Sequence, residues 1–186
     1  MDRIILASAS PRRKQLLEWA EIPFDVIVSD SQESVPEGIK VSEIPVFLAE
    51  QKANIVRQKV SKEKIILAAD TIVVLHEQML GKPLNRADAI RMLSLLSGQI
   101  HEVMTGVSIT NSKKEILFTE TTQVRFHKLS SDEIEHYVDH YQPYDKAGAY
   151  AIQEWIGVTG IRSIEGDFYN VMGLPVSRVI RELKSF

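Results

Sequence analysis

The chain contains no cysteine in 186 residues. This absence excludes disulfide bonds, a thiol nucleophile and a cysteine-ligated zinc site. The sequence also lacks any run that approaches the roughly 18 apolar residues of a membrane-spanning helix, and its first residues do not form the apolar segment of a signal peptide. We therefore expect a cytoplasmic protein that has no membrane partner.

An excess of basic residues is missing as well. Lysine and arginine number 22 against 25 aspartates and glutamates, which gives a formal net charge of −3. Such a surface as a whole does not attract nucleic acid, and the aromatic residues are scattered at core-like spacings instead of forming a platform for bases. We expect no nucleic-acid partner. The length predicts one domain over residues 1–186, with room for two lobes around a cleft.

Helical and strand-like patterns alternate along the chain. Strands are expected at 4–7, 24–28, 65–75, 101–110, 115–127 and 155–164. Helices are expected from residue 11, over 42–60, 85–98 and 130–141, and from residue 175. Fully apolar strands next to helices, together with a hairpin, predict an α/β fold: a mixed twisted sheet flanked by helices.

The start of the first expected helix has an unusual charge pattern. Ser10 is a favourable N-cap. Arg12, Arg13 and Lys14 then occupy the first turn, where the helix dipole disfavours each cation by about 0.3–1 kcal/mol unless an anion is present. A strand, a tight turn, free N–H groups and guanidinium groups together predict a phosphate site. The alternative is a solvated basic turn.

Asp70 is the sharpest catalytic candidate, because it interrupts the apolar run 65–74. An unpaired carboxylate is expensive to bury, so either the strand delivers it into a cleft or a cation pairs with it. A general base or a magnesium ligand would account for it functionally. The alternative is a carboxylate that caps backbone N–H groups at a strand end.

Other charged residues carry weaker signals. Lys52 lies at the edge of the apolar face of its helix, and Lys82 lies in a glycine-proline loop. Each can bind phosphate, and each can equally be a solvated lysine. Glu33 lies in an irregular segment and gains a role only by association, while Asp145 and Lys146 can form a pair.

Taken together, several segments resemble the Maf family, also called septum-formation-inhibitor proteins. These are nucleotide pyrophosphatases related in fold to inosine triphosphate pyrophosphatase. The match runs nearly end to end, through Leu6-Ala7-Ser8-Ala9-Ser10-Pro11-Arg12-Arg13, Gln51-Lys52-Ala53, Ala69-Asp70-Thr71-Ile72-Val73, Gly81-Lys82-Pro83, Leu96-Ser97-Gly98, Asp145-Lys146-Ala147-Gly148-Ala149-Tyr150-Ala151-Ile152-Gln153 and Gly173-Leu174-Pro175.

The resemblance implies hydrolysis of a nucleoside triphosphate between its α- and β-phosphates, which releases the monophosphate and pyrophosphate. Arg12, Thr71 and Gln153 match the branch of the family that is specific for dTTP and UTP, with modified pyrimidine nucleotides as further substrates. The sequence departs from the family pattern after Gln153, where Glu154-Trp155 replaces a common glycine.

The resemblance also implies roles for individual residues. Asp70 accepts the proton from water, and a divalent cation, expected to be Mg²⁺, is held by Glu33 and Asp70. The remaining phosphate contacts are expected from Ser8, Ser10, Arg13, Lys52 and Lys82. Family members are often homodimers, so we expect a homodimer. The competing hypothesis is a non-catalytic regulator that binds a nucleotide or a cell-division partner, but a pure binder gains little from Asp70.

Overall fold

The computed structural model describes residues 3–29 and 34–186 and has an α/β fold. The strands are β1 (Ile4–Leu6), β2 (Phe24–Val26), β3 (Ile66–Leu75), β4 (Gln78–Leu80), β5 (Ile100–Thr110), β6 (Glu115–Phe126) and β7 (Ile161–Glu165). The α-helices are α1 (Pro11–Trp19), α2 (Ile44–Arg57), α3 (Arg86–Leu96), α4 (Ser131–Tyr141), α5 (Trp155–Gly160), α6 (Phe168–Met172) and α7 (Val176–Leu183), and the 3₁₀ turns are η1 (Val41–Glu43) and η2 (Ala147–Ala149).

The described strands form one seven-stranded sheet in the order β2-β1-β3-β5-β6-β7, with β4 paired to β3. β1 runs parallel to β2 and β3, whereas β4 is antiparallel to β3 and β7 is antiparallel to β6. The predicted mixed sheet flanked by helices is therefore confirmed.

The chain divides into two compact units. The first unit contains Met1–Thr71, Thr105–Glu120 and Gly173–Phe186, and the second contains Ile72–Met104 and Thr121–Met172. Strands β3, β5 and β6 contribute residues to both units.

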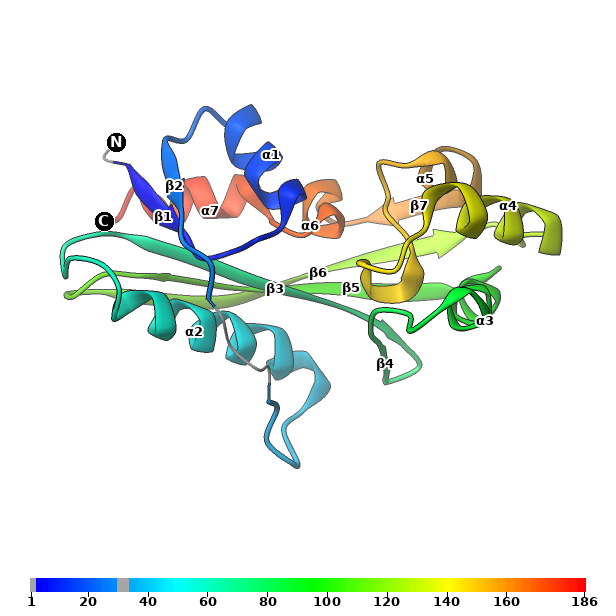
Figure 1. Cartoon of the computed structure of the whole chain (residues 1–186), viewed down its shortest axis with the longest axis horizontal. Coiled ribbons are helices and arrows are strands. Elements are labelled where there is room, and N and C mark those ends of the chain that lie inside the picture. The colour runs from blue at the N-terminus through cyan, green and yellow to red at the C-terminus, as the bar shows by residue number, and fades with distance from the viewer. Residues whose placement is uncertain (1–2, 30–33) are drawn as a thin grey trace. The chain divides into compact units, whose positions relative to one another are not determined.

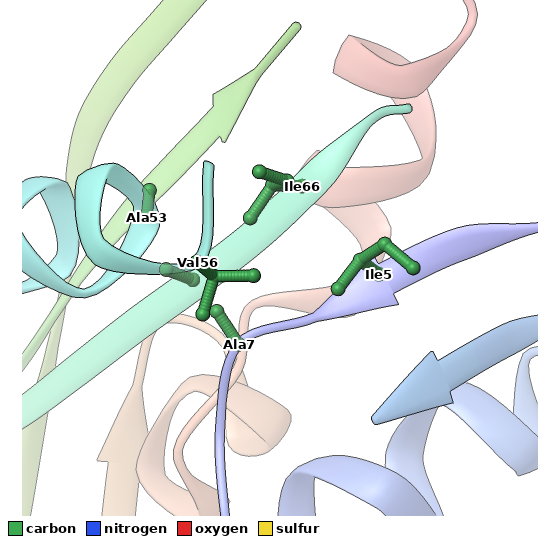
Figure 2. Packing of buried hydrophobic residues seen from close by; sticks show 6 residues of the cluster. Ile5, Ala7, Ala53, Val56 and Ile66 are labelled. Atoms are coloured by element: carbon green, nitrogen blue, oxygen red, sulfur yellow. The ribbon is translucent and has the colours of Figure 1, made fainter. Parts of the chain in front are cut away.

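In the first unit, α2 lies on one face of the strands and α1 and α7 lie on the other (Figure 1). Side chains alternate between the two faces of a strand, and alternate residues at β1 and at the start of β3 pack against α2. That core cluster consists of Ile5, Ala7, Ala53, Val56, Ile66 and Ala68 (Figure 2). The helix approaches the sheet closely, because a Cβ placed on Gly106 of β5 would lie 2.0 Å from the backbone nitrogen of Val46.

In the second unit, β3 turns back into β4 through His76 and Glu77, whose φ angles are 48° and 65°. Two successive positive φ values are the signature of a type I′ hairpin turn. A buried aromatic group joins three segments of this unit: the rings of His101 in β5, Phe126 in β6 and Tyr150 directly after η2 meet edge to face.

Some expected elements differ from those observed. The prediction of a strand over 155–164 is wrong in its first part, since α5 occupies Trp155–Gly160 before β7 begins. The helix expected over 42–60 is a 3₁₀ turn followed by α2, and the strand β4 and helix α6 were not predicted. Within the described ranges, none of the helices is both long and apolar enough to span a membrane.

Candidate active site

The turn between β1 and α1 is organised by its own serines. Ser10 caps α1, its Oγ accepting a hydrogen bond from the backbone nitrogen of Arg13 at 3.5 Å, as predicted. The Oγ of the buried Ser8 accepts from the backbone nitrogen of Ser10 at 3.2 Å. Arg12 follows at the half-buried first turn of the helix. This arrangement fixes the direction in which the N-terminus of α1 points.

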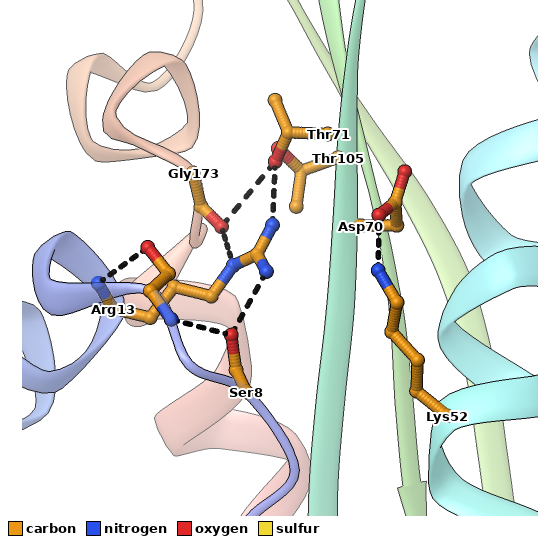
Figure 3. A network of polar contacts seen from close by, with 8 residues as sticks. Ser8, Arg13, Lys52, Asp70, Thr71, Thr105 and Gly173 are labelled. Carbon is orange, nitrogen blue, oxygen red and sulfur yellow. Dashed lines mark hydrogen bonds and ion pairs between the residues drawn. The ribbon is translucent and has the colours of Figure 1, made fainter. Parts of the chain in front are cut away.

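Arg13 is directed into the protein and is 8% exposed. Its guanidinium donates to the carbonyl of Gly173 at 2.8 Å, to the Oγ of Ser8 at 3.1 Å and to the Oγ1 of Thr71 at 3.0 Å (Figure 3). Thr71 in turn lies 2.9 Å from the hydroxyl of Thr105. Arg13 therefore joins the start of α1 to β3 and to the segment before α7, and it is linked to β5 through Thr71.

Thr105 and Gly173 are candidate site residues to which the sequence analysis gave no role. Both belong to the Arg13 network, but they come from segments far from Arg13 in the chain. A threonine in a strand and a glycine two residues before a proline are common, and the three-dimensional contact distinguishes these two.

Asp70 forms an ion pair with Lys52, which reaches it from α2. Lys52 Nζ lies 2.5 Å from Asp70 Oδ1, and each side chain is 13% exposed. Of the two alternatives for a carboxylate in this strand, pairing with a cation is therefore the one observed. The interpretation of Lys52 as a solvated lysine is wrong, because most of its side chain is withdrawn from water.

Adjacent residues of β3 carry these two groups on opposite faces of the sheet. Asp70 continues the alternation of Ile66 and Ala68 toward α2, whereas Thr71 points to Arg13 on the α1 side (Figure 3). Six predicted residues of the first unit thus form two clusters: Ser8, Ser10, Arg13 and Thr71 on one face, and Lys52 and Asp70 on the other.

Both clusters lie where β1 ends. The pairing of β1 with β3 stops at Leu6 and Leu67, while β3 continues to Leu75. Beyond Leu6 the chain turns away into the serine turn. Ligands of open α/β sheets typically bind outside the carboxyl ends of parallel strands, and successive strand residues are only about 3.3 Å apart. One extended ligand at the end of β1 can therefore be contacted by residues from both faces of the sheet.

In the second unit, the loop that carries Lys82 is tied to the segment around Gly148. Gly81 accepts a hydrogen bond from the backbone nitrogen of Gly148 at 3.0 Å, and Lys82 itself is exposed. The predicted pair is confirmed, with Lys146 Nζ 2.7 Å from Asp145 Oδ1. Gln153 is exposed on the turn that precedes α5.

Glu33, the second predicted metal ligand, lies outside the described residues. Among the residues that are described, no three histidines, aspartates or glutamates come together as a ready-made metal cluster. In the first unit, Asp70 is the predicted metal ligand whose position is described.

Comparison with known proteins adds to this geometry. The family model for Maf-like proteins matches residues 3–186. The chain belongs to the Maf family. A relative from Parabacteroides distasonis, named dTTP/UTP pyrophosphatase, is 46% identical over 185 residues, which are 99% of this chain and 96% of that protein. A relative of the same name from Bacillus anthracis is 50% identical over 186 residues, covering 100% of this chain and 96% of that protein.

The fold of this Maf protein also has a solved counterpart. The structure of a HAM1 protein from Coxiella burnetii superimposes with a TM-score of 0.52 over 100% of both chains, at 15% sequence identity. At this identity the likeness concerns the fold alone. The family membership and the fold class expected from the sequence are both confirmed.

Proposed function

We propose that this Maf protein is a nucleoside triphosphate pyrophosphatase that converts dTTP and UTP, and modified pyrimidine nucleotides, to the monophosphate and pyrophosphate. The observation that carries the proposal is the ion pair of Asp70 and Lys52 beyond the carboxyl end of β1. A carboxylate oriented by a cation next to a phosphate-binding turn is what water-dependent cleavage of a phosphoanhydride needs. The names of the two relatives support the choice of substrates.

Asp70 acts as the general base in this proposal. It accepts the proton of the water that attacks the phosphoanhydride, and Lys52 keeps the carboxylate in one orientation through its 2.5 Å contact. A positioned general base contributes about 10²–10⁴-fold to a rate. Lys52 also brings positive charge toward the phosphate oxygens, where negative charge must be neutralised.

The N-terminus of α1 and the serine turn bind phosphate oxygens, together with Arg12 and Lys82. Backbone N–H groups at a helix N-terminus bind anions because they are unsatisfied and the dipole is positive there. Arg13 plays a different part, because its hydrogen bonds hold Ser8 and Thr71 in place. Gln153 reads the edge of the base, since an amide offers the donor and the acceptor that match O4 and N3–H of uracil and thymine.

We propose a magnesium ion as the cofactor, with Asp70 as its ligand among the described residues. Mg²⁺ is typically bound by one or two carboxylates together with substrate phosphates and water, and Asp70 with Glu33 would supply the carboxylates. When bound, the ion would neutralise charge on the phosphate oxygens.

The proposal is tested with the purified protein, Mg²⁺ and a panel of dTTP, UTP, CTP, ATP and GTP, with pyrophosphate and orthophosphate measured separately. We expect pyrophosphate as the product, with dTTP and UTP preferred. Orthophosphate as the first product would contradict cleavage between the α- and β-phosphates. Nucleotide binding without turnover would favour the non-catalytic regulator.

A further inference from the structure

The turn that carries Gln153 is held in place by hydrogen bonds and by buried neighbouring residues, although Gln153 itself is exposed. The backbone nitrogen of Glu154 donates to the carbonyl of Ala151 at 3.1 Å and closes the turn around Gln153. Ile152, directly before Gln153, is only 4% exposed. The exposed amide of Gln153 therefore projects from a hydrogen-bonded turn next to a buried residue.

One hydroxyl group bridges both ends of this turn. Tyr137 of α4 is fully buried. Its Oη accepts a hydrogen bond from the backbone nitrogen of Ala151 at 3.1 Å and donates to the carboxylate of Glu154. Burial, and then the hydrogen bond to Glu154, raise the pKa of the Tyr137 hydroxyl, so it stays protonated and able to donate. The side chain of a neighbouring helix thus fixes the spacing between Ala151 and Glu154.

The second oxygen of Glu154 has its own partner. Lys146 Nζ lies 3.5 Å from Glu154 Oε1 and 2.7 Å from Asp145 Oδ1, and Lys146 is 8% exposed. Because Tyr137 contacts Oε2 and Lys146 contacts Oε1, the two sides of the Glu154 carboxylate are held separately. The ion pair with a buried lysine restricts rotation of this side chain.

Helix α5 supports the same turn from its other end. The backbone nitrogen of Gly157 donates to the carbonyl of Glu154 at 2.9 Å. A Cβ on Gly157 would lie 1.7 Å from the carbonyl oxygen of Ile152, so no larger residue fits without moving the backbone. The residues on both sides of Gln153 are therefore fixed.

We propose that Tyr137 and Glu154 are positioning residues for recognition of the pyrimidine base, acting through Gln153. This inference rests on the proposed function, in which Gln153 reads the edge of the base. An amide rejects a base with the reversed donor and acceptor pattern only if it cannot move to make another hydrogen bond. Tyr137 and Glu154 fix the backbone from which this amide projects, and in this way they favour uracil and thymine over cytosine without touching the substrate.

The test replaces Tyr137 by phenylalanine, which keeps the ring and removes the bridging hydroxyl. We expect kcat/KM for UTP and dTTP to fall by about threefold to tenfold, the range that corresponds to loss of one ordinary hydrogen bond. The value for CTP should change much less, so that the UTP-to-CTP ratio falls. Tyr141→Phe is the matched control, because Tyr141 lies one turn further on α4 and its exposed ring stacks on Tyr137 at 5.0 Å. Its ratio should equal that of the unmodified protein.

Glu154→Gln is a second variant, which is nearly isosteric and keeps an acceptor for Tyr137 while removing the charge that faces Lys146. Its UTP-to-CTP ratio should lie between those of the unmodified protein and Tyr137→Phe. It keeps the inference testable should Tyr137→Phe fail to fold. An unchanged ratio in Glu154→Gln would remove Glu154 from the inference.

A double substitution separates this inference from the proposed function. In a Gln153→Ala protein, adding Tyr137→Phe should leave the UTP-to-CTP ratio unchanged, because the amide to be positioned is gone. If Gln153→Ala leaves the UTP-to-CTP ratio unchanged, this result contradicts the proposed role of Gln153 itself. If Gln153→Ala lowers the ratio but Tyr137→Phe does not, or if Tyr137→Phe depresses UTP and CTP equally, the positioning role alone is overturned.

Discussion

Arg13 and Asp70 are both largely withdrawn from solvent, and their contacts with the described residues differ in kind. Arg13 donates to neutral oxygens of Ser8, Thr71 and Gly173, whereas Asp70 faces the full opposite charge of Lys52. A set of hydrogen bonds that joins distant segments stabilises the fold. A charge pair of which one member can exchange a proton with water suits catalysis. We therefore expect substitutions at the two positions to change different measurements.

Asp70→Asn should remove activity and leave the protein folded. The amide is nearly isosteric with the carboxylate but cannot serve as a general base, so kcat for dTTP should fall by about 10²–10⁴-fold. Turnover is measured by pyrophosphate release, and folding by thermal melting. Asp25→Asn serves as the control, because Asp25 also forms an ion pair, with Arg3, but is about half exposed. Normal turnover of a folded Asp70→Asn protein would show that the carboxylate is structural.

Arg13→Lys should destabilise the first unit although the charge is kept. An ammonium group cannot reproduce the fork that serves Ser8, Thr71 and Gly173 together. Buried acceptors left without donors cost about 1–3 kcal/mol, and urea denaturation should show a loss of this size. Arg86→Lys is the comparison, since Arg86 forms ion pairs but is about half exposed, and exposed pairs are worth about 1 kcal/mol or less. Equal losses in both proteins would argue against the Arg13 network.

At the scale of the elements, helices with local capping signals were predictable from the sequence. Asn85 caps α3 by accepting from the backbone nitrogen of Asp88, and Ser130 forms the expected capping box with Glu133 at α4. These contacts span three residues, so the sequence contains both partners.

Elements that depend on packing were not predictable in the same way. Residues 155–160 contain β-branched and aromatic side chains that favour a strand, yet they form α5, in which Gly157 packs closely against the carbonyl of Ile152. The hairpin between β3 and β4 uses His76 and Glu77 in place of the Asn-Gly that marks such turns.

The same distinction between local signals and long-range contacts applies to the candidate site. The N-cap at Ser10 and the unusual carboxylate at Asp70 are properties of short segments, and both were identified. The partner of Asp70 and the hydrogen bond from Arg13 to Thr71 join residues that are 18 and 58 positions apart. Such contacts follow from strand register and helix packing, which a single sequence does not state.

Gly106→Ala tests the close approach of α2 to the sheet. The new methyl group would meet the backbone of Pro45 and Val46 at 2.0–2.4 Å, so α2 would have to move. Overpacking of this kind costs about 1–3 kcal/mol, which urea denaturation would detect. A Cβ at Gly81 meets nothing within 4 Å, and Gly81→Ala should therefore change stability by less than about 0.5 kcal/mol. Equal stability of the two variants would contradict the packing of α2 on β5.

At the scale of the whole molecule, one buried histidine links stability to pH. His101 is 1% exposed, its ring packs against Phe126, and its Nε2 lies 2.7 Å from the hydroxyl of Tyr150. Burial lowers the pKa of His101 from 6.5 to about 4. Burial also raises the pKa of Tyr150, so the tyrosine stays neutral over this range. His101 is therefore uncharged in the folded protein at pH 7.

The stability of the protein should fall as the pH drops from about 6.5 to about 4. In this window the unfolded chain takes up a proton on His101 that the folded protein does not, so acid favours unfolding. The total effect is about 3 kcal/mol for a pKa difference of this size, and below pH 4 His101 contributes no further loss. Urea denaturation at several pH values measures it, with His101→Gln as the reference, because glutamine does not titrate while the carboxylates common to both proteins cancel. The unfolding free energy of the unmodified protein minus that of His101→Gln should fall steadily as the pH drops toward 4. Parallel curves for the two proteins would mean that His101 is accessible to protons in the folded state.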